Sequence, residues 1–156
     1  MIVAVGNDLR GDDGVACYIA EKMEPKTERL GSIFNGNREV YSQVPIIVNA
    51  GNNPENVIDE IVLLKPLKVI IIDAANFQGG PGEARIIKEE QINSVVLSTH
   101  MFPLGAVAKL IKEDTGAEVV FLGIQPKNME LGDKISDEVK NTANEIIKCV
   151  TQYQEK

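Results

Sequence analysis

The sequence predicts an α/β three-layer sandwich, in which helices cover both faces of a mostly parallel, five-stranded, twisted sheet with one antiparallel edge strand. Short continuous apolar runs, typical of strands buried on both faces, alternate along the chain with amphipathic segments at helical spacing. Such alternation favours a parallel sheet with right-handed crossovers. The length of 156 residues fits a single domain, 1–156, with one good core.

The first half of the chain supplies two strands and two helices. Residues 2–5 form an apolar run, and residues 13–23 carry an i, i+4 stripe made by Val15, Ile19 and Met23. Residues 44–49 predict the second strand. A helix over 53–64 follows, with an asparagine cap and a proline at its first position.

The segment 24–44 has no clear period. Pro25 and Gly31 interrupt any regular element there, and Asn35-Gly36 between apolar residues predicts a small hairpin.

The second half supplies three strands and two helices. Residues 68–73 form the clearest strand, and 83–87 form a short alternating strand after a glycine-rich turn, which is typical of a sheet edge. A helix over 103–114 leads to a strand over 119–124. Ser136 is expected to cap a last helix whose inward residues run from Val139 to Tyr153.

Composition narrows the cellular setting and the partners. The net charge of −7 argues against nucleic acid or an anionic membrane as the main partner. There is no apolar run of membrane-spanning length and no signal-peptide pattern, so we expect a cytoplasmic protein with no membrane insertion. Aromatic residues are only 4%, and we therefore expect a monomer. Cys17 and Cys149 show no metal or redox spacing and are expected to be reduced core residues.

Polar residues stand where three separate segments reach the expected sheet rim. Asp12 and Asp13 lie in a glycine-bracketed turn after the first strand, Asp73 ends the third strand, and His100 is the only histidine. Ligands collect at the carboxyl ends of strands in such sheets. Structural alternatives stay open, in which Asp12 or Asp13 caps the following helix, Asp73 caps a turn and His100 has a structural role.

Together these side chains have the chemistry of a metal site. Two carboxylates and one imidazole suit nickel, zinc, cobalt or manganese, and three protein ligands leave positions open for water or an incoming group. The chain has no G-x-S-x-G elbow, and its first glycine loop is neither a Walker A motif nor G-x-G-x-x-G.

Four segments resemble the endopeptidases that mature nickel–iron hydrogenases, in the right order over nearly the whole chain. They are Gly6 to Gly14, Asp73-Ala74 with Pro81-Gly82-Glu83, Ser98 to Leu104, and Gly123 to Pro126. The last of these and the segment 49–56 are closest to the hydrogenase-3, formate-hydrogenlyase-type branch. The chain departs from the family pattern at Ala4, where a glycine is common, and at Asn49-Ala50-Gly51, where Asp-Gly-Gly is usual.

The resemblance implies a specific reaction. Such peptidases remove a C-terminal extension from the hydrogenase large-subunit precursor after nickel has been inserted. Asp13, Asp73 and His100 match the metal-contacting positions, which are thought to sense the nickel of the precursor rather than hold a permanent ion. We expect zinc or cadmium to substitute for nickel. Asp12 and Asp73 are candidate general bases for an attacking water, which leaves open whether the peptidase is of aspartic or metallo type.

Two other functions remain as alternatives. A non-catalytic checkpoint module that only binds metal and precursor would need the same acidic cleft. A nucleotide-binding domain is disfavoured, because two acids in the first loop would repel phosphate. If Asp12 mainly caps the first helix, its change to asparagine should be the mildest of the acid substitutions, because asparagine caps about as well.

Overall fold

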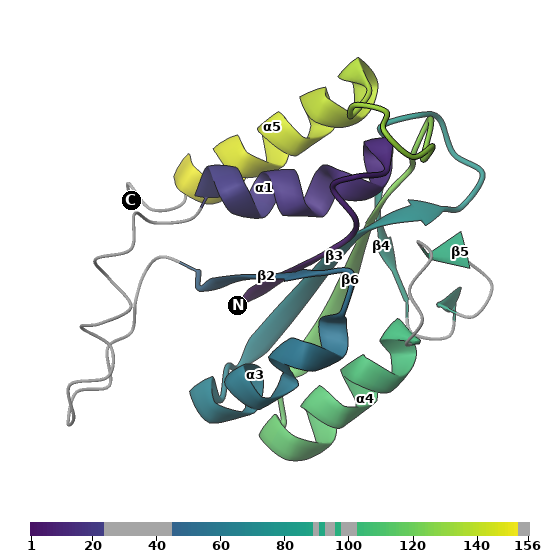
Figure 1. Ribbon diagram of the computed structural model, residues 1–156. Coiled ribbons are helices and arrows are strands. Elements are labelled where there is room, and N and C mark those ends of the chain that lie inside the picture. The colour runs from purple at the N-terminus through teal and green to yellow at the C-terminus, as the bar shows by residue number, and fades with distance from the viewer. Residues whose placement is uncertain (24–44, 89–90, 93–95, 98–102, 153–156) are drawn as a thin grey trace.

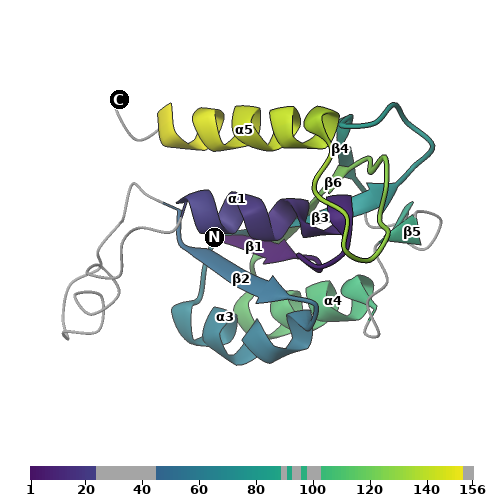
Figure 2. The same ribbon diagram turned by 45° about the horizontal axis from the view of Figure 1, so that its top comes forward.

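The computed structural model describes residues 1–23, 45–88, 91–92, 96–97 and 103–152 (Figures 1 and 2). The strands are β1 (Ile2–Val5), β2 (Ile47–Gly51), β3 (Lys68–Asn76), β4 (Ala84–Ile87), β5 (Val96–Leu97) and β6 (Glu118–Ile124). The helices are α1 (Val15–Met23), α3 (Ile58–Leu64), α4 (Leu104–Thr115) and α5 (Asp137–Gln152), with single 3-10 turns at η1 (Gly11–Gly14) and η2 (Pro54–Val57).

The sheet has the order β2-β1-β3-β6-β4, in which the first four strands are parallel. β4 pairs antiparallel with β6 at the edge, which confirms the antiparallel edge strand expected from its short glycine-rich turn. The sequence did not predict β5. It pairs antiparallel with Ala75 and Asn76, because β3 continues three residues beyond Asp73.

Helices cover both faces of this sheet, with α1 and α5 on one side and α3 and α4 on the other (Figure 1). Alternation along the strands divides the core between the two faces. Val3 and Ile71 pack in the cluster that includes α4, whereas Ala4 and Ile72 pack in the cluster that includes α1 and α5. The three-layer α/β/α sandwich is therefore confirmed.

Several local expectations need correction. α1 begins at Val15 rather than residue 13, and both acids of the first loop lie in η1. Asn53 precedes η2 but makes no side-chain capping bond. Cys149 is exposed and not a core residue, because six helical positions turn it about 240° from the buried Ala143.

Other expectations fall outside the described residues. They are the hairpin at Asn35-Gly36, the inward position of Tyr153 and the placement of His100. Among the helices that are described, none is long and apolar enough to cross a membrane.

Candidate active site

The glycine bracket folds the first loop into a compact turn at the carboxyl end of β1. Asn7 N donates to Asp13 O at 3.2 Å, and Leu9 N donates to the Asn7 side chain at 3.0 Å. Gly6 must be glycine here, because a Cβ built on it would collide with the carbonyl oxygen of Asp13. The turn holds Asp12 and Asp13 in the interior, with exposed fractions of 0% and 1%.

Asp12 connects this turn to the loop between β6 and α5, residues 125–136. Its Oδ2 accepts hydrogen bonds from Lys127 N at 2.7 Å, Asn128 N at 2.9 Å and Ser136 Oγ at 3.0 Å. Its Oδ1 accepts from Ser136 N at 2.6 Å. These four bonds match the roughly four lone-pair sites of a carboxylate. Asp12 thus positions two loops, and its carboxylate bonds run to the loop 125–136, which leads into α5, rather than to the helix that follows Asp12 in the sequence.

Asp13 and Asp73 are the two buried carboxylates of the expected metal set. Asp73 is 2% exposed and lies in β3 opposite Gly123 of β6, and η1, which carries Asp13, contacts β3. Together with burial, the negative charges of both acids raise the pKa of the thiol of Cys17, which lies about one helical turn after Asp13. The two side chains therefore lie in the surroundings of the same thiol, although they come from residues far apart in the sequence.

The pKa of the Cys17 thiol reflects the burial and the negative charge of this region. Its Sγ donates to the carbonyl oxygen of Gly6 at 3.4 Å. Burial raises the pKa of the Cys17 thiol to about 11, and the negative charges of Asp8, Asp13 and Asp73 act in the same direction. The thiol therefore stays protonated at neutral pH, which makes it a poor metal ligand or nucleophile.

His100 lies outside the described residues, so its convergence with the two acids stays a prediction. Within the described part of the chain, His, Cys, Asp and Glu form no group of three that could hold an ion. The backbone of Leu97 pairs with Ala75, two residues after Asp73, which fixes the chain three residues before His100 close to the end of β3.

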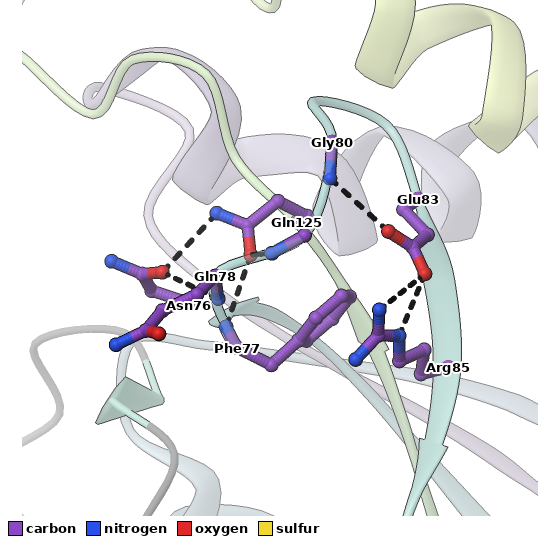
Figure 3. Close-up of polar contacts among 8 residues, drawn as sticks. Asn76, Phe77, Gln78, Gly80, Glu83, Arg85 and Gln125 are labelled. Carbon is purple, nitrogen blue, oxygen red and sulfur yellow. Dashed lines mark hydrogen bonds and ion pairs between the residues drawn. The ribbon is translucent and has the colours of Figure 1, made fainter.

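Gln125 and Ser136 are two site residues that the sequence analysis did not single out as functional. Gln125 follows β6 and is only 6% exposed. Its Oε1 accepts from Phe77 N at 3.0 Å and Gly79 N at 3.1 Å, and its Nε2 donates to Asn76 Oδ1 at 3.3 Å (Figure 3). The same Nε2 also donates to Pro126 O at 3.2 Å. Gln125 thus holds the turn after β3. The sequence feature that could have identified Gln125 is its position as a polar residue directly after a buried strand.

The same turn is closed on its outer side by an exposed ion pair. Glu83 accepts from Arg85 at 2.7 Å and from Gly80 N at 3.1 Å, and the Arg85 guanidinium lies 4.5 Å from the centre of the Phe77 ring (Figure 3). The hydrogen bond from Arg85 is the main reason why the pKa of Glu83 is lowered. Because the ion pair is solvent-exposed, it contributes little to the free energy of unfolding, and we assign it the role of shaping the turn.

Two cavities lie at opposite ends of the strands. One of about 400 Å³ is lined by Asp8, Cys17 and Asn49, next to the first loop. The other, of about 420 Å³, is mainly apolar and is lined by Met1 and Lys68 at the amino ends of β1 and β3. Only the first lies at the end of the sheet that carries Asp13 and Asp73.

Comparison with known proteins identifies the family of this chain. The HycI hydrogenase maturation protease family model matches residues 29–153. The chain belongs to this family. It is 36% identical over 127 residues to the hydrogenase 3 maturation protease of Escherichia coli K12, covering 81% of this chain and 72% of that protein. It is 33% identical over 153 residues to a putative hydrogenase maturation protease of Methanocaldococcus jannaschii, covering 97% of this chain and 86% of that protein.

Solved structures of the HycI family have the same fold. The crystal structure of the HycI nickel–iron hydrogenase maturation protease from Thermococcus kodakarensis matches with a TM-score of 0.78 at 30% identity, covering 99% of this chain and 91% of that one. The solution structure of the Escherichia coli endopeptidase HycI matches with a TM-score of 0.75 at 30% identity, covering 99% and 90%. This HycI-family chain is therefore a peptidase, as the resemblance of its motifs implied.

Proposed function

We propose that this peptidase removes the C-terminal extension of a nickel–iron hydrogenase large-subunit precursor after nickel insertion, and that it recognises the bound nickel through Asp13, Asp73 and His100. The observation that carries the proposal is the burial of Asp13, in the turn after β1, and Asp73, in the carboxyl half of β3, near one thiol in a HycI-family fold. Membership of this family makes the chain a peptidase, which excludes the non-catalytic checkpoint module.

The chemistry of the two acids supports a cation as the recognised group. Charged carboxylates are costly to bury, and a divalent ion shared between them offsets that cost. Carboxylate oxygen and imidazole nitrogen are suitable donors for nickel. The thiol beside them is held protonated, so it does not compete for a nickel ion that the precursor holds. In this proposal the nickel belongs to the substrate.

Asp12 is the less suitable of the two candidate general bases, because its carboxylate already has a structural role. Both oxygens of Asp12 already accept bonds from the loop 125–136, and proton transfer to Asp12 would break that connection. Asp73 lies in β3, three residues before the strand ends at the turn that Gln125 holds. We propose that Asp73 accepts the proton of the attacking water and that Asp12 positions the loop carrying Asp13.

A cleavage assay tests the proposal directly. The purified chain is incubated with nickel-loaded and nickel-free large-subunit precursor, and shortening is followed by intact-mass spectrometry. We expect cleavage of the nickel-loaded form alone. Zinc and cadmium reconstitution of the precursor then tests whether either ion substitutes. Equal cleavage of nickel-free precursor would remove nickel recognition from the proposal.

Variants assign the roles of the three residues. Asp13→Asn, Asp73→Asn and His100→Ala should each reduce cleavage at least a hundredfold, because two remaining ligands hold and orient the ion poorly. Asp59→Asn, an exposed acid on α3, is the matched control and should cleave like the wild type. Full activity of the Asp13 and Asp73 variants would place the site elsewhere.

A further inference from the structure

Two exposed leucines flank the candidate site on loops that are distant in sequence. Leu9 is 64% exposed in the loop before η1, and Leu131 is 75% exposed in the loop 125–136. Gly132 N donates to the carbonyl oxygen of Leu9 at 2.8 Å, which joins the two loops directly beside these residues. Figure 2 shows the two loops meeting beyond the end of β1. We call Leu9 and Leu131 the leucine rim.

The leucine rim is built on a fixed support. Asp12 N donates to Asn128 O at 2.9 Å, and the Asp12 carboxylate accepts from Lys127 N and Asn128 N. Arg10 Nε adds a bond to Met129 O at 3.2 Å. These contacts join residues 10 and 12 of the first loop to residues 127–129 of the second loop, close in sequence to Leu9 and Leu131. Two large apolar side chains are therefore held toward solvent on a braced surface, where a rigid partner contact loses little entropy.

Position relates this rim to the substrate. Leu9 lies four residues before Asp13 on the same loop, so a protein whose metal and scissile segment reach Asp13 approaches the loop that carries Leu9. The other most exposed leucines, Leu63 and Leu67, lie in α3 and just before β3, at the amino end of the sheet. Continuity with the acids thus separates the rim from ordinary exposed leucines.

We infer that the leucine rim is the docking surface for the folded body of the precursor protein, which presents aliphatic or aromatic side chains next to the segment that is cut. The inference rests on the proposed function, because it takes its partner from it. Docking through the rim lets the peptidase recognise the folded, metal-loaded precursor in addition to the sequence of its tail. Burial of the two leucines supplies apolar contact energy that the charged site cannot provide.

Binding of the precursor to rim variants tests the inference. Leu9→Ser and Leu131→Ser should each weaken precursor binding several-fold, and the double variant should weaken it at least about tenfold, measured as Kd by biolayer interferometry. In the cleavage assay KM should rise by the same factor while kcat stays within about twofold. Leu67→Ser is the matched control and should leave both Kd and KM unchanged. The double variant Leu9→Met with Leu131→Met keeps the rim apolar and should bind like the wild type.

The outcomes separate this inference from the proposed function. Absence of cleavage by the wild-type chain would overturn the proposed function, while the Kd comparison would still decide the role of the rim. An unchanged Kd in the Leu9→Ser, Leu131→Ser double variant would overturn the docking surface. A wild-type dimer in analytical ultracentrifugation that this variant converts to monomer, with unchanged precursor Kd, would assign the rim to self-association instead.

Discussion

The carboxylate of Asp12 accepts hydrogen bonds from both the backbone nitrogen and the hydroxyl of Ser136, at 2.6 Å and 3.0 Å. The two residues are 124 positions apart in the sequence. Ser136 O in turn accepts from Lys140 N at 2.9 Å and so begins α5. One buried acid therefore fixes both the first loop and the start of the last helix.

Asp12→Ala should be the most destabilising of the acid substitutions at the site. It leaves three backbone N–H donors, those of Lys127, Asn128 and Ser136, without their acceptor. We expect a loss of about 2–4 kcal/mol in the free energy of unfolding, because part of that loss is recovered by water. At roughly 2–4 °C per kcal/mol, Tm should fall by roughly 5–15 °C in calorimetry.

Asp12→Asn refines this prediction. Asparagine keeps one acceptor but turns an amide donor toward backbone donors, so it should lie between Ala and the wild type. The sequence analysis expected this change to be the mildest because it assumed that Asp12 caps α1. The Asp12 carboxylate instead binds the loop 125–136, so that assumption does not hold. Asp137→Asn, an exposed change in the first turn of α5, is the control. A Tm for Asp12→Asn equal to the control would contradict the role of Asp12.

Gln125→Glu should loosen the turn after β3. A glutamate keeps an acceptor for Phe77 N and Gly79 N but faces two acceptors, Asn76 Oδ1 and Pro126 O, with a negative charge. We expect a loss of about 1–3 kcal/mol in urea unfolding. Gln152→Glu, which adds the same charge at the exposed end of α5, should have no measurable effect. Identical urea midpoints for the two variants would show that the bonds of Gln125 do not hold the turn after β3.

Gly6→Ala should damage the first loop far more than Gly80→Ala. A Cβ at Gly6 collides with the backbone carbonyl of Asp13, and relief of that contact moves the loop that carries the acids. Overpacking of this kind costs about 1–3 kcal/mol. Nothing lies within 4 Å of a Cβ at Gly80, so the second variant should stay within about 0.5 kcal/mol of the wild type. Thermal unfolding of both variants, with cleavage rates, decides this prediction.

The two cysteines should differ sharply in reactivity. Cys149 is exposed, whereas Cys17 is buried with its thiol pKa raised to about 11. Iodoacetamide at pH 8 should therefore modify Cys149 rapidly and Cys17 only in denaturant, as peptide mass spectrometry can measure. Equal modification of both thiols in the native protein would show that Cys17 is open to solvent.

Cys17 also predicts a loss of stability at alkaline pH. The pKa of its thiol is raised from 9.0 in the reference state to about 11 in the fold, so between these values the unfolded chain releases a proton that the folded chain retains. The contribution of Cys17 to stability is complete below pH 9 and is lost as pH rises toward 11. Urea midpoints of wild type and Cys17→Ser across this window should diverge, with the steeper decline in the wild type.

Much of this architecture was predictable from local patterns. The apolar run of residues 68–73 identified β3, and the stripe of Val15, Ile19 and Met23 identified α1, because burial of one face imposes a period on the sequence. The antiparallel edge strand β4 followed from its short glycine-rich turn. The family motifs likewise indicated a peptidase from the sequence alone.

Tertiary structure decided what each polar residue does. The sequence placed Asp12 and Asp13 side by side, but only the folded chain directs Asp12 to Ser136 and buries Asp13 near Cys17 and Asp73. β5 is two residues long and carries no period of its own, and it exists because β3 extends far enough to pair with it. Local patterns report which face of an element is buried, whereas hydrogen bonds between segments 124 residues apart depend on how the chain closes in space.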